Sequence, residues 1–497
     1  ETRRHGGPVD EMERAEKCKP PSNRPNIKNY PTMTGKRDTI VAVASGTGGA
    51  IALIRLSGPT AIAIGDRIFT GVSGSPLSSS KGFTVHIGHI RNEADEIIDD
   101  VLVSLFRAPR SYTGEDMLEI SCHGSTFIQQ EILRLCIREG ARMAQGGEFT
   151  LKAFLAGKMD LSQAEAVADI IASDSRAALT LATRQIRGGY SKEFTDLRQQ
   201  LLELTSLLEL ELDFSEEDVE FADRTRLSAM LTEIEHRISS LSDSFRLGNI
   251  LKNGVPVAIV GSPNVGKSTL LNALLNEERA LVSDIAGTTR DLIEETINIQ
   301  GVTFRFIDTA GIRDTADPLE HMGIERTLQR VRQAAIILLM VDANDPSEQI
   351  EAQLQSIPVG EGQQIALILN KSDKATEEQI ALSKKTLQQK NAIPVLSISA
   401  KQKGNLQALT SLLYDSVHAD ESLRSGQLIV SNARHHEALE AACGATHRAQ
   451  NGLAGGISGD LLAQDIREVL HHLGTITGEI TSQDILNSIF SKFCIGK

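Results

Sequence analysis

The segment 255–270, VPVAIVGSPNVGKSTL, constrains this chain more than any other stretch of its sequence. Apolar residues predict a buried strand, the motif Gly261-x-x-x-x-Gly266-Lys267-Ser268 follows it, and leucines at helical spacing come next. This strand–loop–helix order is the setting of a phosphate-binding P-loop. The glycines let the backbone wrap around phosphates, Lys267 can neutralise the outer phosphates, and the Ser268 hydroxyl can bind Mg²⁺. The segment therefore predicts a nucleotide-phosphate site.

Three further motifs indicate which nucleotide is bound, and each follows a predicted strand. The strand 303–307 ends in DTAG, residues 308–311, whose Asp suits an outer Mg²⁺ contact and whose Gly N–H suits a γ-phosphate. The strand 365–369 ends in NKSD, where Asp373 can accept two N–H bonds from the guanine edge that adenine does not offer. A last strand ends in SAK at 399–401, placed to support the base. Four motifs in this order predict a GTPase of the doubly wound α/β type.

The predicted guanine-nucleotide site combines the P-loop, the segment SDIAGTTR and the three later motifs. Its members are Asn264, Val265, Gly266, Lys267, Ser268, Thr269, Ser283, Asp284, Ile285, Ala286, Gly287, Thr288, Thr289, Asp308, Thr309, Ala310, Gly311, Asn370, Lys371, Ser372, Asp373, Ser399, Ala400 and Lys401.

The route to hydrolysis differs from that of the well-known small GTPases, in which a Gln after the DxxG motif orients water. Here that position holds Ile312, which neither donates nor accepts a hydrogen bond, so help must come from elsewhere. Arg290 and Arg313 are candidates for an arginine finger, although such residues usually serve solvent or interface contacts. Asn264 is more informative, because its side-chain oxygen could help to coordinate a monovalent cation where a finger would sit. The segment 283–290 offers hydroxyls and carbonyls for that ion and for Mg²⁺.

Length and composition bound the remaining expectations. A chain of 497 residues exceeds one core and suggests about three domains. The net charge of −14 and the absence of Trp argue against a basic or base-stacking nucleic-acid surface. Scattered cysteines without a CxxC pair indicate a reducing compartment with no disulfide framework or zinc site. No apolar run approaches the length of a membrane span. We expect a soluble, cytoplasmic protein with no membrane association.

Patterning along the chain predicts a multidomain architecture. Residues 1–36 are polar and Pro-rich, and we expect a disordered extension or an expression remnant. Residues 37–155 hold short β-rich runs and two helix-like pieces, which predicts an α+β domain. Long helical patterns cover 156–251 and 419–497, and the GTPase unit at 252–418 lies between them. The expected fold is an α+β N-terminal domain, an all-α domain in two parts and an inserted Ras-like α/β P-loop GTPase domain.

Two groups of residues have a role that pattern alone leaves open. Arg55 and Glu119 each interrupt an apolar strand pattern, which places them either on a solvent face or in a ligand pocket lined by charges. The His pairs 435–436 and 471–472 have no carboxylate or His partner at metal-ligand spacing, so we expect ordinary surface or core residues.

The motifs GSPNVGKST, AGTTRD, DTAGIR and NKSD, the inserted GTPase unit and the terminal FCIGK together resemble the MnmE (TrmE) family of tRNA-modification GTPases, over roughly 37–497. The resemblance implies a folate-binding N-terminal domain that forms a homodimer. It also implies an FAD-dependent partner, MnmG (GidA), in a heterotetramer or larger complex. With that partner the family adds an aminomethyl or carboxymethylaminomethyl group to C5 of the wobble uridine of certain tRNAs. The one-carbon unit comes from a tetrahydrofolate derivative, 5-formyl- or methylene-tetrahydrofolate.

The resemblance also implies roles for individual residues, carried over motif by motif. The implied K⁺ ligands, some of them through the backbone, are Asn264, Ser283, Ile285 and Thr288. The implied Mg²⁺ ligands are Ser268 and Thr289, and Glu320 would position the attacking water, with Lys267 as the second catalytic residue. The implied folate contacts are Arg55, Glu119, Lys158 and Lys497. Cys494 is a candidate nucleophile toward uridine, and Ser283 stands where relatives often carry Thr, which keeps the hydroxyl.

Two other classes of function compete with this interpretation. A GTP-switched ribosome assembly factor would need an RNA-binding appendage such as a KH-type GXXG element in a basic domain, and the sequence shows neither. A purely structural dimeric scaffold would not require intact phosphate, Mg²⁺ and guanine motifs.

Overall fold

The structure is a computed structural model that describes residues 38–46, 48–213, 224–279, 295–307, 331–360, 362–391, 393–417, 428–491 and 493–496. It divides into two compact units. One unit runs through Ala168 and resumes at His471, and the other is Asp169–Leu470.

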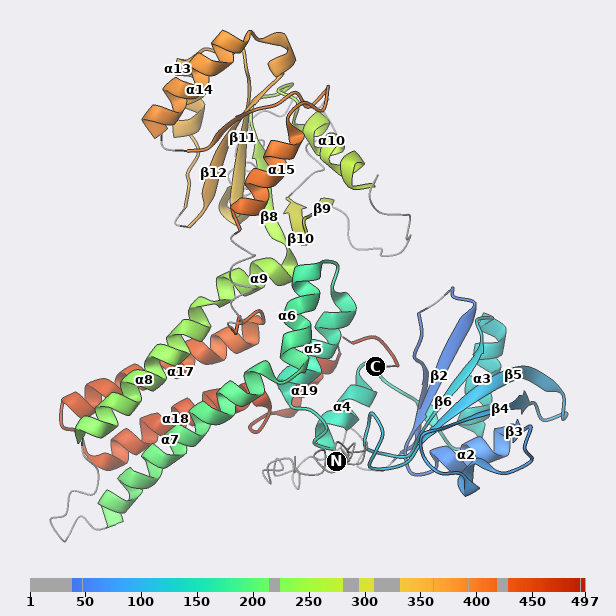
Figure 1. The fold of residues 1–497 in the computed structure, drawn as a ribbon. Coiled ribbons are helices and arrows are strands. Elements are labelled where there is room, and N and C mark those ends of the chain that lie inside the picture. Colours follow the sequence, from blue (N-terminus) through green and yellow to red (C-terminus); the bar gives the residue numbers. More distant parts are fainter. Residues whose placement is uncertain are drawn as a thin grey trace, which may run out of the picture. The chain divides into compact units, whose positions relative to one another are not determined.

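The first unit is built on a seven-stranded sheet of order β3-β4-β5-β6-β2-β1-β7 (Figure 1). Every neighbouring pair is antiparallel except β1 with β7. The strands are β1 Ile40–Val43, β2 Ile51–Ser57, β3 Phe69–Gly71, β4 Thr84–Arg91, β5 Ile97–Phe106, β6 Met117–His123 and β7 Arg142–Met143. The helical elements of this part are α2 Ala61–Ile68, η3 Leu77–Ser79, α3 Thr126–Arg138, α4 Glu148–Leu155, the start of α5 Leu161–Ala172, and α19 Gln483–Phe490.

The two faces of this sheet have different neighbours. In β2, Ala52, Ile54 and Leu56 are buried and alternate with Leu53 and Arg55, as expected for a strand with one face in the core. The buried set packs with apolar residues of α2 and α3. The face that carries Arg55 is the one on which α4 and the segment between β5 and β6 lie, through a small apolar cluster with β1.

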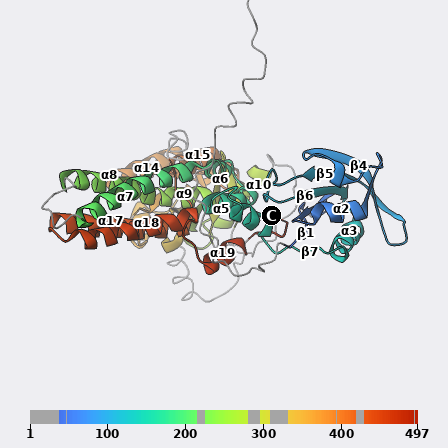
Figure 2. The same cartoon turned by 90° about the horizontal axis from the view of Figure 1, so that it is seen from below.

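The second unit contains a helical part and a GTPase-like part. Its helices outside the GTPase part are α6 Arg176–Ile186, α7 Gly189–Asp213, α8 Arg224–Asp243, α9 Phe245–Asn253, α17 Ala433–Ala454 and most of α18 Gly459–Thr477. The helices α8 and α17 run side by side in both views (Figures 1 and 2). They come from opposite sides of the inserted segment in the sequence, so they bracket the point where the chain enters and leaves it.

The GTPase part is a six-stranded sheet of order β13-β12-β11-β8-β10-β9, parallel except for the β9–β10 hairpin. Its strands are β8 Val255–Val260, β9 Glu295–Ile299, β10 Val302–Phe306, β11 Ile336–Asp342, β12 Gln364–Asn370 and β13 Val395–Ser397. Its helical elements are α10 Lys267–Arg279, α13 Ser347–Gln355, η5 Ser372–Lys374, α14 Glu377–Asn391 and α15 Leu406–Asp415. The four strands predicted before the motifs are confirmed as β8, β10, β12 and β13.

Helices cover both faces of this sheet. Residues of α10 and α15 pack with one set of alternating strand residues, and residues of α13 and α14 pack with the other set. A parallel sheet buried on both faces explains the near-continuous apolar runs IILLMV and IALIL. The predicted combination of an α+β domain, a helical domain and an inserted P-loop domain is confirmed. The motifs after β8, β12 and β13 meet at the carboxyl edge of the sheet, where doubly wound folds bind ligands.

Candidate functional site: a guanine-nucleotide site and a charged pair under the C-terminal tail

The P-loop connects β8 to α10 through three residues with positive φ: Gly261 at 150°, Asn264 at 59° and Gly266 at 107°. A Cβ at Gly261 would lie 2.1 Å from the Met340 carbonyl oxygen, and one at Gly266 would lie 2.4 Å from Nδ2 of Asn370. Both positions therefore need glycine for conformation and for space. This close approach of the loop to β11 and β12 fixes where its N–H groups point.

Asn370, the last residue of β12, joins the P-loop to the loops that would hold the base. Its Nδ2 donates to the Val265 carbonyl oxygen at 2.8 Å, and its Oδ1 accepts from the Ala400 N–H at 2.9 Å. The side chain is 3% exposed, so these two bonds are made away from water. Burial strengthens both bonds and makes either one costly to lose. One buried amide at the end of β12 thus links the P-loop directly to the SAK loop.

The NKSD loop presents an ionised carboxylate to solvent. The Ser399 hydroxyl donates to Oδ1 of Asp373 at 2.6 Å, and this bond holds the pKa of Asp373 below its usual range. Lys371, at a φ of 61°, places its Nζ 2.8 Å from Oδ2 of Asp342 at the end of β11. A fixed, acceptor-only carboxylate is the partner that the two adjacent N–H groups of guanine require.

The residues that face the phosphates lie at the start of α10. Nζ of Lys267 donates to the carbonyl oxygens of Gly261 and Ser262, at 2.8 and 2.9 Å, so its ammonium group lies against the P-loop. Ser268 and Thr269 follow in the first turn, where backbone N–H groups and the helix dipole favour anions. The exposed Asn264 sits on the same loop. The structure therefore brings the P-loop, NKSD and SAK residues together at one edge.

The remaining GTPase predictions fall on residues that the structure does not describe. They are Ser283, Asp284, Ile285, Ala286, Gly287, Thr288, Thr289, Arg290, Asp308, Thr309, Ala310, Gly311, Ile312, Arg313 and Glu320. Lys497 also lies outside the described residues. The roles of these residues stay predictions.

In the first unit, Arg55 and Glu119 form an ion pair across neighbouring strands. They are register partners on β2 and β6, with Nε and Nη2 of Arg55 at 2.9 and 2.8 Å from Oε1 of Glu119. The side chains are only 12% and 20% exposed. The guanidinium also lies over the rings of Tyr112 and Phe149, at 5.4 and 5.6 Å from their centroids. The solvent-face alternative for this pair is therefore wrong, because aromatic rings and the chain end cover it.

The chain end that covers this pair is the CIGK tail. Nη1 of Arg55 donates to the Gly496 carbonyl oxygen at 3.1 Å, and Ile495 forms an antiparallel bridge with Gly146. A Cβ at Gly496, where φ is 97°, would lie 2.3 Å from the Val43 carbonyl oxygen, so only glycine fits there. Cys494 is exposed beside this contact. The tail thus places Cys494 in the same neighbourhood as Arg55.

Lys158 is exposed and lies against the segment between β5 and β6, because a Cβ at Gly114 would be 3.5 Å from its Cε. That segment also carries Tyr112. The predicted folate residues within the described part, Arg55, Glu119 and Lys158, therefore gather around one segment and the tail.

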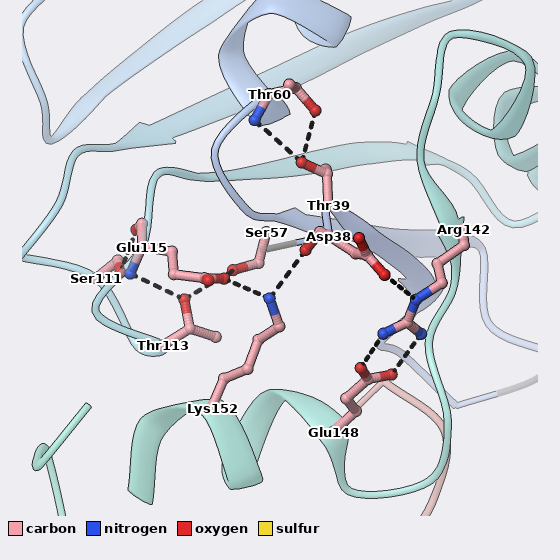
Figure 3. Close-up of polar contacts among 10 residues, drawn as sticks. All are labelled: Asp38, Thr39, Ser57, Thr60, Ser111, Thr113, Glu115, Arg142, Glu148 and Lys152. Carbon is pink, nitrogen blue, oxygen red and sulfur yellow. Dashed lines mark hydrogen bonds and ion pairs between the residues drawn. The ribbon is translucent and has the colours of Figure 1, made fainter. Parts of the chain in front are cut away.

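A polar network that the sequence did not predict anchors this segment (Figure 3). Nζ of Lys152, on α4, donates to Oε2 of Glu115 at 2.8 Å and to the Asp38 carbonyl oxygen at 3.0 Å. The Ser57 hydroxyl bonds Glu115 at 3.1 Å and the buried Thr113 hydroxyl at 2.7 Å. The network ties the segment to the ends of β1 and β2.

A second group in the same view secures the start of α4. Arg142 bridges Glu148 and Asp38, with contacts of 2.5 and 3.0 Å to the two Glu148 oxygens and 3.3 Å to Asp38. Since α4 carries Phe149 and the segment carries Tyr112, these ion pairs position both rings beside Arg55. The one feature of the sequence that could have indicated this network is Lys152, a charged residue inside the apolar run EFTLKAFL.

No helix among the described residues is both long and apolar enough to cross a bilayer.

Comparison with known proteins gives matches over nearly the whole described chain. A family profile for the MnmE helical domain matches residues 161–494, and one for the GTP-binding protein TrmE N-terminus matches residues 39–158. The tRNA modification GTPase MnmE of Bacteroides thetaiotaomicron is 54% identical over 466 residues, which is 93% of this chain and 100% of that protein. The protein of the same name from Flavobacterium johnsoniae is 49% identical over 469 residues, 93% of this chain and 99% of its own length.

Similarity to solved structures is far weaker. A GTP-binding protein from Sulfolobus solfataricus, solved in complex with GDP, is 18% identical and covers 58% of this chain and 76% of its own, with a TM-score of 0.26. That score is too low to add to the argument.

Proposed function

The chain belongs to the MnmE family of tRNA-modification GTPases, and on that premise we propose a potassium-activated GTPase that acts on the wobble uridine with an FAD-dependent partner. Family membership already makes the chain a GTP hydrolase of tRNA modification that uses Mg²⁺. The observation that carries the nucleotide assignment is the buried Asn370 amide, which joins the P-loop to the SAK loop beside the ionised Asp373.

The described residues have distinct tasks in this proposal. Asp373 selects guanine, and Lys267 together with the P-loop N–H groups balances the charge of the β- and γ-phosphates. Ser268 fits a Mg²⁺ ligand because its hydroxyl follows the P-loop directly in the first turn of α10, and Thr289 is its proposed second ligand. The ion supplies positive charge to phosphate oxygens when bound.

Potassium activation rests on Asn264 and on residues outside the described part. Asn264 is exposed in the P-loop, with a left-handed backbone conformation, so its side-chain amide is free to bind an ion beside the phosphates. Ser283, Ile285 and Thr288 are the other proposed ligands, and Glu320 positions water. Turnover in potassium should exceed turnover in sodium, and Glu320→Ala should bind GTP normally yet not hydrolyse it. Equal rates in both salts would refute the activation, and full turnover in Glu320→Ala would refute that role.

The one-carbon donor, a tetrahydrofolate derivative, is proposed to bind beside Arg55, Glu119, Lys158 and Lys497. A heteroaromatic ring with N–H and carbonyl groups suits a carboxylate and a guanidinium that are flanked by aromatic rings. Cys494, exposed on the adjacent tail, remains the proposed candidate for attack on uridine. Equilibrium binding of 5-formyl-tetrahydrofolate should be lost in Glu119→Gln.

A homodimer is proposed through the outer face of β4 and β5. Val85, Ile87 and Leu102 are 63%, 65% and 45% exposed, and Ile87 and Leu102 are register partners. Exposed apolar side chains that lie side by side on one face of a sheet are typical of an interaction site. The double variant Val85→Glu/Ile87→Glu should shift the chain from dimer to monomer in light scattering.

Nucleoside mass spectrometry of bulk tRNA tests the assignment to wobble-uridine modification, which we propose takes place in the cytoplasm. Cells without this protein should lack the C5-substituted wobble uridine, and wild type but not Glu320→Ala should restore it. An unchanged nucleoside profile would favour a GTP-switched ribosome assembly factor instead. Co-purification with an FAD-containing subunit is the accompanying test of the partner, MnmG (GidA).

A further inference from the structure

Three side chains with metal-ligand chemistry meet between α8 and α17, two helices that carry none of the nucleotide-binding motifs. The cysteine spacing in the sequence predicted no zinc site, because it shows only ligands that are close along the chain. They are Glu235 on α8 and Cys443 and His447 on α17. Their ligand atoms, a carboxylate oxygen, a sulfur and an imidazole nitrogen, all lie within 4.8 Å of one another. Nε2 of His447 is 3.2 Å from Oε1 of Glu235. We propose that Glu235, Cys443 and His447 form a binding site for one divalent transition-metal ion, Zn²⁺ being the best fit.

The geometry follows from helix periodicity. Cys443 and His447 are four residues apart, so they project from the same face of α17. The helices α8 and α17 run antiparallel, since Ser242 contacts Glu440 while Glu235, earlier on α8, contacts His447, later on α17. That register brings Glu235 opposite the Cys443–His447 pair.

The donor set and spacing match one ion. Thiolate, imidazole and carboxylate are the protein ligands of Zn²⁺, and three of them with one open position is a common arrangement. Zinc–ligand bonds place two ligand atoms of a tetrahedral site roughly 3.3–3.8 Å apart. The three ligand atoms lie within 4.8 Å of one another, so ion binding would require them to approach by about 1 Å. Binding would release the thiol proton, and the imidazole would bind in its neutral form.

The electrostatic setting favours a cation over a bare thiolate. The carboxylates of Glu235, Glu440 and Asp243 lie close enough to the Cys443 sulfur to place it in a negative electrostatic field. The same negative field that opposes a thiolate attracts a divalent ion, whose charge reverses that preference. The alternative is that His447 and Glu235 form an ordinary surface pair and that Cys443 only packs between the helices. The metal-site proposal differs from this alternative in requiring the Cys443 thiol to bind the ion.

The position suggests what the ion would do. α8 ends twelve residues before β8 begins, and α17 follows the inserted GTPase part, so the two helices hold the chain on either side of it. An ion bound by both helices would cross-link the segment that leads into the GTPase part to the segment that leaves it. This site is independent of the proposed GTPase and folate chemistry.

Cobalt spectroscopy on the full-length protein, free of any polyhistidine tag, tests the proposal. One Co²⁺ per chain should give a thiolate-to-cobalt charge-transfer band, and one equivalent of Zn²⁺ should remove that band. Cys443→Ser should abolish the band, and His447→Ala and Glu235→Gln should each weaken the metal affinity about tenfold or more. Cys494→Ser and His236→Ala are the controls, and both should keep the band. Cys494 is an exposed thiol on the C-terminal tail, and His236 is an exposed imidazole on α8 that does not belong to the cluster.

Thermal unfolding supplies the second readout. Zn²⁺ should raise the unfolding temperature of wild type and of Cys494→Ser but not of Cys443→Ser, because only a native site links binding to stability. Far-ultraviolet circular dichroism checks that each variant is folded. If Cys443→Ser is not folded, His447→Ala replaces it as the variant that removes a ligand. Absence of the charge-transfer band in wild type, or its persistence in folded Cys443→Ser, would overturn the proposal.

Discussion

Replacing Asn370 with Ala tests whether one buried amide sets the geometry of the nucleotide site. The change removes two hydrogen bonds, of 2.8 Å to the Val265 carbonyl and 2.9 Å from the Ala400 N–H. Val265 and Ala400 are 4% and 3% exposed, so both backbone groups would be left buried and unpaired.

Each orphaned buried group costs about 1–3 kcal/mol, which gives roughly 2–6 kcal/mol for the pair. The loops can recover part of this by moving apart until water reaches these groups, and that movement disrupts the site. We therefore expect the loss to appear in nucleotide affinity. At about 1.4 kcal/mol per tenfold, the low end corresponds to roughly a 30-fold rise in the Kd for GDP.

The assay is equilibrium titration with a fluorescent guanine nucleotide, in Mg²⁺ and at fixed ionic strength. Asn405→Gly is the matched control: Nδ2 of Asn405 also donates to a backbone carbonyl, that of Ser397, at 2.8 Å, but it does so at the surface. Glycine tolerates the φ of 61° at that position. We expect less than a threefold change for the control. A Kd for Asn370→Ala within threefold of wild type would refute the linking role of this amide.

Three further changes test the base contact, its pH dependence and the docking of the C-terminal tail. Asp373→Asn should weaken GTP binding and allow xanthosine triphosphate to bind, because an amide can pair with the base carbonyl that replaces the guanine amino group. Unchanged selectivity in competition titrations would contradict the base contact. The Ser399 hydrogen bond lowers the pKa of Asp373, so guanine affinity should persist in mild acid and be lost only as the pH falls through that lowered pKa. Ser399→Ala should shift this loss of affinity to higher pH. Coincident pH profiles of the variant and wild type would contradict the role of the Ser399 bond. Gly496→Ala should detach the tail, since its Cβ would lie 2.3 Å from the Val43 carbonyl oxygen, and carboxypeptidase should then remove the last residues faster than in wild type; equal rates would show that the tail is not docked there.

Local pattern was sufficient for the four motif-bearing strands of the GTPase part. The strands before the P-loop, NKSD and SAK motifs were predictable because a parallel sheet buried on both faces requires apolar runs, and each run ends in a motif. The meeting of those motifs at one edge follows from parallel topology alone. The motifs do not predict the hydrogen bond between Asn370 and Ala400, because that bond depends on the distance between the carboxyl ends of β12 and β13.

The charged pair of the first unit was beyond local pattern for a different reason. The sequence pattern is compatible both with Arg55 and Glu119 on a solvent face and with a charged ligand pocket. The alternation of a strand shows which residues share a face but not what covers that face. The cover comes from Tyr112, from Phe149 on α4, and from a carbonyl of Gly496, which is 441 residues away along the chain. Only the tertiary fold brings these together.

That long-range cover has a consequence for how the site depends on the rest of the unit. Arg55 binds Glu119 through its own sheet, so the pair survives any change that leaves β2 and β6 in register. The rings and the tail have no such support, and they depend on Lys152 and Glu115 for the segment, on Arg142 and Glu148 for α4, and on glycine at 496 for the tail. Loss of any one of these anchors should therefore expose the charged pair to water while leaving the sheet intact. The polar network of Figure 3 thus holds in place the segment and the helix whose rings cover the charged pair.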